Sequence, residues 1–155
     1  MIVGIDPGQS GGVAYIDLEG CRSWAEPMPT LGKDIDAYAV SDWLRDWQPD
    51  TVIVEKVHSM PKQGVVSMFR FGLGFGRILG VLEALAIPYR LVTPQEWKRV
   101  VLAGTAKDKD AAIAFARRAY PHIDLTPGRK RTPHDGIADA VCLADYGRQL
   151  IGSTG

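Results

Sequence analysis

Short apolar runs separated by turn-forming residues make up the first part of the chain. They predict three strands, at residues 2–5, 11–18 and 21–25. Asp6-Pro7-Gly8 ends the first run, and Glu19-Gly20 provides a tight turn between the second and the third. The pattern therefore predicts a strand followed by a hairpin at the start of the fold.

The rest of the chain favours helices, in which apolar residues recur every three or four positions. The predicted elements are, in order, a helix at 33–48, a strand at 51–54, a loop at 57–64, a helix at 65–86, a strand at 89–92, a short helix from Pro94, a helix at 106–119, a loop at 125–133 and a helix at 135–150. This order, β-β-β-α-β-α-β-α-α-α, predicts a mixed α/β fold, and we expect one domain over residues 1–155.

The composition excludes several classes of protein. A chain of 155 residues that is 46% apolar can bury a core and is not a disordered tail. It has no run of about 18 apolar residues and no signal-peptide pattern. We therefore expect a cytoplasmic protein without a membrane span. Cys21 and Cys142 form no CxxC pair and are too few for a disulfide framework or a zinc site built on cysteines.

The net charge of zero conceals an asymmetry along the chain. Residues 1–55 carry ten acidic and three basic side chains, whereas residues 94–132 carry nine basic and four acidic ones. Residues 56–93 are also basic, with five basic and one acidic side chain. Because local charge matters more than net charge at a contact surface, the middle of the chain could bind a polyanion. A solvated basic face explains the same counts equally well.

Four carboxylates stand at positions that suit a metal site. Asp6 and Glu55 each end an apolar strand, and Asp135 and Asp139 share one face of the last helix. Oxygen donors without a His or Cys cluster favour Mg²⁺ or Mn²⁺. Two such ions about 3.5–4 Å apart can drive phosphodiester hydrolysis. Taken singly, each residue is also explained as a turn residue, a strand end or a helix start.

The motifs that contain these carboxylates resemble the RuvC-like Holliday junction resolvases, with most similarity to small phage-borne members. The resemblance runs from residue 2 to about residue 146 and implies a ribonuclease H-like mixed sheet (β-β-β-α-β-α-β-α) flanked by helices. It also implies a homodimer that uses Mg²⁺, or Mn²⁺ in its place, to nick a four-way DNA junction in pairs. The motifs are Ile5-Asp6-Pro7-Gly8, Gly11-Gly12-Val13-Ala14, Val54-Glu55-Lys56-Val57, Pro94-Gln95-Glu96-Trp97-Lys98 and His134-Asp135-Gly136-Ile137-Ala138-Asp139-Ala140.

The same resemblance implies roles for the carboxylates. Asp6, Glu55 and Asp139 match the family's metal ligands. In the bacterial proteins the fourth ligand lies three residues before the last aspartate, where this chain has Gly136. Asp135, four residues before, is expected to take its place.

The family's DNA contacts imply further residues. His58 stands where the bacterial proteins carry an aromatic wedge, and it stacks on a base less well than Phe does. Lys107 and Lys109 both match the position of a family lysine. His134 is expected to contact the helix start or the substrate, with a role beside the metal ligands as the alternative. The candidate DNA contacts are Lys56, His58, Lys62, Lys98, Lys107, Lys109, Arg129, Lys130 and Arg131. For His58 and for the loop at 129–131, an exposed residue without a DNA role is the alternative.

Three glycines recur every four residues in the long predicted helix. Gly72, Gly76 and Gly80 each cost about 1 kcal/mol relative to Ala, so a close neighbour should justify them. We expect the sheet of the same chain to pack on this stripe. The face that bears Phe71 and Phe75 is expected to meet a partner subunit.

Three other functions fit part of the sequence. Sugar kinases and Hsp70-like ATPases also open with a strand, an aspartate and glycines, but they need two such domains, so no nucleotide cofactor is expected. A non-catalytic junction-binding protein is another alternative, which the loss of any carboxylate would favour, but all four are present. A related nuclease that acts on other branched DNA or on RNA–DNA hybrids is compatible with every motif.

Overall fold

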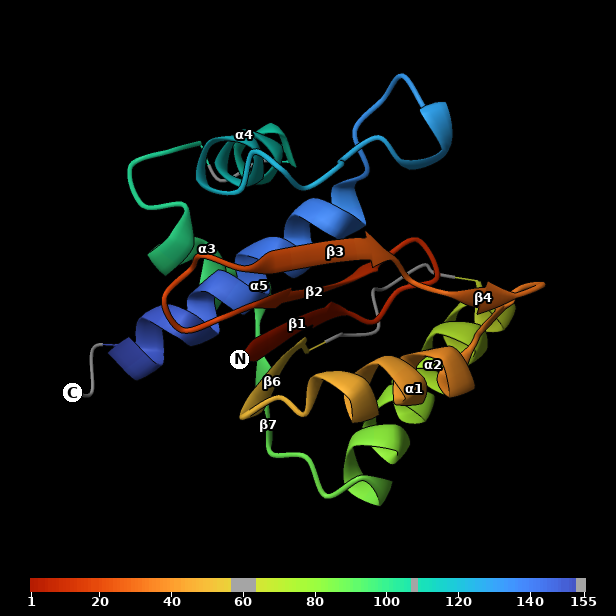
Figure 1. Cartoon of the computed structure of the whole chain (residues 1–155). Helices are drawn as coiled ribbons and strands as arrows, with labels where there is room; N and C mark the ends of the chain where they lie inside the picture. Colours follow the sequence, from red (N-terminus) through yellow and green to blue (C-terminus); the bar gives the residue numbers. More distant parts are fainter. Residues whose placement is uncertain (57–63, 107–108, 153–155) are drawn as a thin grey trace.

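The computed structural model describes residues 1–56, 64–106 and 109–152 (Figure 1). Its centre is a five-stranded sheet in the order β3-β2-β1-β6-β7, and a two-stranded sheet is formed by β4 and β5. The strands are β1 (Ile2–Asp6), β2 (Gly12–Ile16), β3 (Ser23–Pro27), β4 (Thr30–Leu31), β5 (Asp34–Ile35), β6 (Thr51–Glu55) and β7 (Tyr89–Val92). The helices are α1 (Ala37–Trp47), α2 (Val65–Ala84), α3 (Pro94–Val101), α4 (Lys109–Ala119) and α5 (Asp135–Gly152), with a 3₁₀ turn, η1, at Pro127–Arg129.

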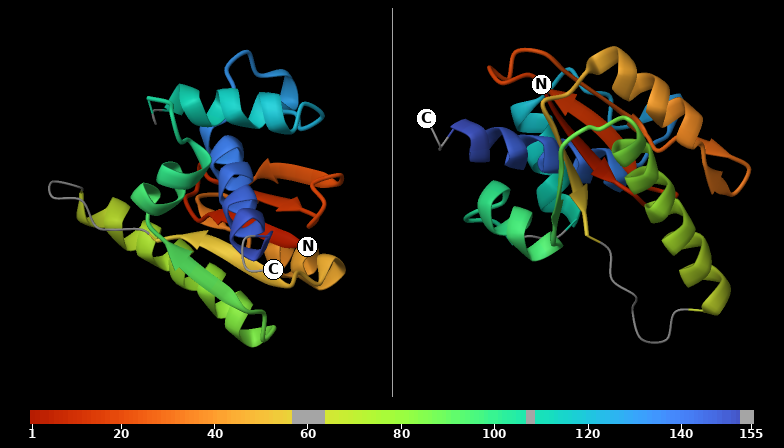
Figure 2. Two further views of the ribbon diagram at one scale, coloured as in Figure 1. Left: turned by 90° about the vertical axis from the view of Figure 1, so that its left-hand side faces the viewer. Right: turned by 90° about the horizontal axis from the view of Figure 1, so that it is seen from below.

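The large sheet is mixed and is covered on both faces. The pairs β1–β2 and β2–β3 are antiparallel, whereas β1–β6 and β6–β7 are parallel. Helix α5 lies across one face with α3 and α4 beside it, and α1 and α2 cover the other face (Figure 2). Alternate residues of one strand serve the two layers: Ile2 packs on the α5 side, and Val3 and Ile5 pack on the α1 and α2 side.

Glycines allow α5 to lie directly on the backbone of β1 and β2. A Cβ atom at Gly4 would stand 2.2 Å from the carbonyl oxygen of Ala140, and one at Gly12 would stand 2.5 Å from that of Gly136. A Cβ atom at Gly136 would in turn stand 2.3 Å from the carbonyl oxygen of Ser10. These close approaches fix the start of α5 beside the end of β1, where Asp6 stands.

The structure changes several predicted boundaries. The mixed sheet and the sequence positions of its five strands agree with the prediction, but β3 begins at Ser23 instead of residue 21. The prediction that a helix begins at residue 33 is wrong, because β4 and β5 form a hairpin there. Gly32 has φ +63°, which allows the tight turn, and Asp36 caps α1 by accepting the N–H of Ala39 at 3.1 Å.

The glycine stripe of α2 does not face the sheet, so that prediction is wrong. Among the described residues, and apart from the neighbouring backbone of α2 itself, no atom lies within 4 Å of a Cβ built at Gly72, Gly76 or Gly80. The face that packs inward contains Gly74, Ile78 and Leu82, which are buried. Periodicity alone does not say which face of α2 meets the core, because most of its residues are apolar or glycine and few polar side chains mark the outer face.

The outer face of α2 is apolar as well. Phe75 is half-buried and packs in part against the core of its own chain, and the contact of Phe71 and Phe75 with a partner subunit stays a prediction. The large apolar side chains that α2 exposes are Val65, Val66, Met68, Phe69 and Leu73. Among the described residues, α2 is the one helix long and apolar enough to cross a membrane, a test that uses length and composition only. This is weak evidence for a span, and Gly74, Ile78 and Leu82 bind α2 to the sheet.

Candidate active site

Asp6 and Glu55 stand side by side at one edge of the sheet. They end the parallel neighbours β1 and β6, whose register pairs Ile5 with Val54 immediately before them. Both carboxylates are half-buried. The carboxyl edge of parallel strands is where α/β folds place their sites, so the topology brings together two residues that are far apart in sequence.

Asp139 joins them from α5. Burial raises the pKa of Asp6 to about 7, and repulsion from Glu55 and then from Asp139 adds to the effect. The N–H of Gly8, which lies 3.2 Å from Asp6 Oδ1, acts in the opposite direction. Carboxylates on β1, β6 and α5 therefore lie near enough for each negative charge to disfavour another.

Glu55 has two neighbours that hold its charge. Its pKa is raised by burial, while the Trp97 indole and the charge of Lys98 lower it. Trp97 Nε1 donates to Glu55 Oε2 at 2.7 Å, and Lys98 Nζ lies 5.2 Å from the centre of the Trp97 ring. Both come from α3, which is anchored by a capping box in which Thr93 and Glu96 bond reciprocally.

The start of α5 holds Asp135 and His134. Asp135 lies in the first turn, half-buried, one turn before Asp139. His134 Nδ1 accepts the N–H of Ile137 at 3.3 Å, which is the predicted contact with the helix start. Burial and then the charge of Lys130 lower the pKa of His134. The imidazole is thus kept neutral, as its acceptor role requires.

The chemistry of the donor set fits a hard divalent cation. Asp6, Glu55, Asp135 and Asp139 offer only carboxylate oxygens, and burial, followed by repulsion from Glu55 and Asp139, raises the pKa of Asp6, so a cation at this place would favour its ionised form. Within residues 1–56, 64–106 and 109–152, however, no group of three or more His, Cys, Asp and Glu side chains lies close enough together to coordinate a metal ion. The electrostatics, and not a finished coordination shell, indicate the site.

Only some of the predicted DNA-contacting residues lie beside the carboxylates or His134. Lys98 lies beside Glu55, Lys130 lies near His134, and Lys56 is exposed just after β6. The other described candidates are exposed Arg131, Arg129 in η1 and Lys109 at the start of α4. His58, Lys62 and Lys107 lie outside the described residues.

Sequence reasoning missed a hollow beside the carboxylates. It has a volume of about 570 Å³ and lies between the turn after Asp6, the β4–β5 hairpin and α2. Lys33 and Arg70 are exposed on its wall, while Arg77 lies 3.6 Å from Asp34. The hairpin that carries Lys33 was itself predicted as helix, so no pattern placed this side chain near Asp6.

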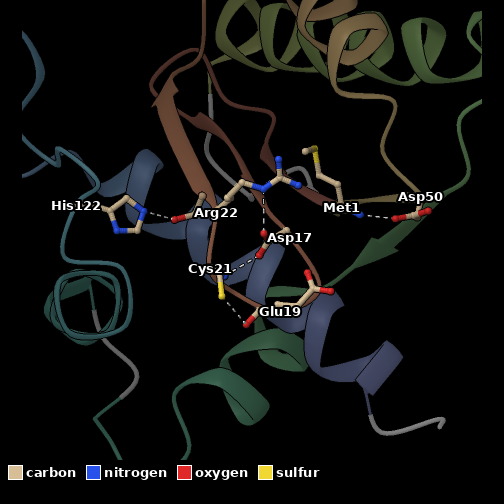
Figure 3. Close-up of polar contacts among 8 residues, drawn as sticks. Met1, Asp17, Glu19, Cys21, Arg22, Asp50 and His122 are labelled. Carbon is tan, nitrogen blue, oxygen red and sulfur yellow. Dashed lines mark hydrogen bonds and ion pairs between the residues drawn. The ribbon is translucent and has the colours of Figure 1, made fainter.

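The opposite edge of the sheet holds carboxylates of another kind (Figure 3). Asp17 Oδ1 accepts the N–H of Cys21 at 2.7 Å, and its Oδ2 lies 3.2 Å from Arg22 Nε. The backbone of Arg22 is the main cause of the lowered pKa of Asp17. Asp50 pairs with the terminal amine of Met1. Asp17 therefore stabilises the turn between β2 and β3, and Asp50 pairs with the first residue of the chain.

Comparison with known proteins agrees with the resemblance drawn from the motifs. No family model matches the chain. The curated RuvC crossover junction endodeoxyribonuclease of Paenarthrobacter aurescens (strain TC1) is 29% identical over 159 residues, covering 92% of this chain and 78% of the relative. The corresponding protein of Pseudarthrobacter chlorophenolicus is 28% identical over 92% of the chain and 77% of its own length.

Solved structures share the fold. RuvC of Thermus thermophilus superposes with a TM-score of 0.69 at 19% identity, covering 99% of this chain and 96% of the other. The yeast mitochondrial Holliday junction resolvase Ydc2 superposes with a TM-score of 0.59 at 13% identity, covering 97% of this chain and 78% of the other. The predicted ribonuclease H-like mixed sheet flanked by helices is therefore confirmed. The relatives along 92% of the sequence, together with this fold, support the similarity of the chain to the RuvC-like Holliday junction resolvases.

Proposed function

We propose that the chain resolves four-way DNA junctions as a metal-dependent endonuclease, within one domain over residues 1–155 and in the cytoplasm. The observation that carries the proposal is the meeting of Asp6, Glu55 and Asp139, where burial and repulsion raise the pKa of Asp6 to about 7. Such an arrangement costs stability in the absence of a cation, which is typical of a functional site. The activity is the one named in the curated relatives.

The proposed cofactor is Mg²⁺, with Mn²⁺ as a substitute. Asp6, Glu55, Asp135 and Asp139 would hold it, because carboxylate oxygens suit hard divalent ions. When bound, the metal supplies an activated water and neutralises charge on the leaving oxygen. Asp135 is preferred to position 136 because a side chain at Gly136 would collide with the Ser10 carbonyl.

The remaining residues orient the carboxylates and attract the phosphate. Trp97 holds one oxygen of Glu55, and His134 holds the first turn of α5 that bears Asp135. Lys98 and Lys130 bring positive charge to this edge of the sheet. In the proposal both attract the DNA backbone, together with Lys56, Lys109 and the loop Arg129-Lys130-Arg131. The proposed contacts at His58, Lys62 and Lys107 rest on the family resemblance alone.

A homodimer is part of the proposal, because two symmetric nicks require two active sites. The support in this chain is the outer face of α2, where Val65 is 84% and Phe69 is 71% exposed. The open stripe of Gly72, Gly76 and Gly80 would let a second helix approach its backbone closely. Light scattering at micromolar concentration should give twice 16.9 kDa. A monomer that still nicks both strands symmetrically would contradict this part.

The test of the function is cleavage of a labelled four-way junction in Mg²⁺ by the wild type, Asp6→Asn and Glu55→Gln. Both variants should lose cleavage and keep junction binding, since only the charge of a ligand is removed. A plain duplex and an RNA–DNA hybrid run in parallel. A preference for the hybrid, or near-normal cleavage by either variant, would contradict the proposal.

A further inference from the structure

The catalytic edge contains one hydrogen bond that the proposed ligand set does not account for. Trp97 Nε1 donates to Glu55 Oε2 at 2.7 Å across 42 residues of sequence. An indole has a single N–H and no acceptor, so it can bond one oxygen of a carboxylate and leave the other. The bond therefore distinguishes Oε2 from Oε1 of Glu55.

Trp97 is held both by core packing and by the capped start of α3. Its side chain is 0% exposed, in a cluster with Val92 of β7 and Ala138 of α5. The Thr93–Glu96 capping box fixes the start of α3, with bonds of 2.6 Å and 3.3 Å between backbone N–H groups and side-chain oxygens. The indole N–H thus points from a rigid base, whereas Glu55 stands at a strand end, half-buried.

A neutral donor is the suitable partner here. A buried Arg or Lys bonded to Glu55 would neutralise the carboxylate and compete with a cation, whereas an indole orients it and leaves its negative charge available. Lys98, the nearby cation, lies over the Trp97 ring. It provides charge near Glu55, whereas the indole donates a hydrogen bond directly to the carboxylate and can orient it.

We propose that Trp97 is a positioning residue that fixes the rotation of the Glu55 carboxylate, so that Oε1 faces the shared metal site while Oε2 stays bonded to the indole. This inference rests on the proposed function. Partners of this kind, which orient a metal ligand, typically change metal affinity or activity by about 10–100-fold when they are removed.

The test replaces the donor without emptying the core. Trp97→Phe removes the N–H together with some volume, and β-(3-benzothienyl)alanine at position 97 removes the N–H at nearly constant shape. Leu102→Val is the matched control, because Leu102 is buried in the same cluster, just after the end of α3, and carries no hydrogen-bonding group on its side chain. For each protein, free Mn²⁺ is titrated by electron paramagnetic resonance without DNA, and kcat and junction affinity are measured in Mn²⁺.

Both Trp97 replacements should weaken Mn²⁺ binding and lower kcat by about 10–100-fold, with junction affinity within twofold of wild type. Leu102→Val should change neither. In a Glu55→Gln background the Trp97 replacement should weaken Mn²⁺ binding no further, because the oriented carboxylate is already gone.

The experiment distinguishes a failure of the proposed function from a failure of the role of Trp97. A wild type that binds no Mn²⁺ and cleaves no junction overturns the proposed function itself. A wild type that does both, with a benzothienylalanine variant that matches it in Mn²⁺ affinity and kcat, overturns the role of Trp97 alone. A loss that appears equally in Leu102→Val would show that packing, and not the N–H, is responsible.

Discussion

The two edges of the central sheet use the same residue type in opposite ways. At the edge of Asp17 and Asp145, carboxylates are bonded to Arg22, to Arg148 and to backbone N–H groups. At the edge of Asp6, burial and neighbouring carboxylates raise the pKa instead. The first arrangement stabilises the fold and leaves no charge for a ligand. The second costs stability and keeps charge available, as expected where a cation binds.

The same contrast holds along one helix. Asp145 of α5 is 1% exposed and accepts bonds from Tyr120 at 2.5 Å, from Arg148 at 2.7 Å and from Gln149 at 2.6 Å. Asp139, less than two turns earlier in the same helix, adds to the electrostatic repulsion at Asp6. Position along α5 therefore decides whether an aspartate serves the core or the site.

The largest expected effect is at the structural edge. Asp145→Ala should lower the free energy of unfolding by about 3–5 kcal/mol, because it leaves Arg148 and the Tyr120 hydroxyl without their shared buried partner. Denaturant unfolding measures the loss. The folded fraction should cleave junctions at the wild-type rate, since Asp145 lies at the far edge. A stable variant that has lost cleavage would contradict the division between the edges.

Asp6→Asn should have the opposite effect on stability. The folded pKa of about 7 lies above the ordinary value of 3.8, so Asp6 costs nothing below pH 3.8. The cost grows as pH rises from 3.8 to 7, because the unfolded state ionises first. At pH 8 without metal, the variant should be more stable than wild type by about 2–4 kcal/mol.

The measurement is urea unfolding of both proteins at pH 4 and pH 8 in chelator. The stability difference should vanish at the lower pH, and added Mg²⁺ should stabilise wild type more than the variant. A difference independent of pH would show that ionisation of Asp6 is not its source.

Gly136→Ala tests how the helix is brought to the site. The added Cβ atom would lie 2.3 Å from the Ser10 carbonyl oxygen, and the backbone must move to accept it. We expect a loss of about 1–3 kcal/mol in stability, as for other overpacked positions. Cleavage should fall as well, because α5 carries Asp135 and Asp139. Gly152→Ala, in open space at the other end of α5, is the control and should change neither quantity.

Sequence patterns predicted what depends on local order. The strands that end in Asp6 and Glu55 were predicted correctly, because short apolar runs closed by turns have few other solutions. The hairpin at β4–β5 was missed, since two-residue strands carry no periodicity. The packing face of α2 was assigned wrongly because the sequence does not distinguish Gly72 from Gly74. Only the fold shows that Gly74 lies against Ile35.

The site shows the same limit. A family motif contained Trp97, but nothing local indicated that its N–H reaches Glu55, 42 residues away. Lys33 and Arg70 meet at one hollow only because the β4–β5 hairpin lies against α2. Residues that end strands can thus be found by pattern, whereas those that surround them depend on packing between distant segments.

The two edges also differ in how they use cations, and this gives the smallest expected effect. Arg22 and Arg148 are paired with carboxylates at the structural edge, whereas Lys130 of the loop at 129–131 is exposed near His134, whose pKa is lowered by burial and then by the charge of Lys130. Exposed cations near a site for DNA are expected to displace counterions from phosphates when DNA binds. Replacing Arg129, Lys130 and Arg131 together by Ala should therefore weaken junction binding.

A salt titration separates this effect from a loss of folding or of chemistry. In an Asp6→Asn background, each lost phosphate contact should lower the slope of log K against log salt by about 0.9. With Asp6 restored, cleavage at saturating junction should remain, because the carboxylates are untouched, and base preference at the cut should not change. Arg22→Ala is the matched control, since its guanidinium is bonded to Asp17 at the far edge, and it should leave the slope unchanged. Equal slopes for wild type and the triple variant would mean that the loop is only solvated, and the DNA contacts would then have to be sought at Lys56, Lys98, Lys109 and the wall formed by Lys33 and Arg70.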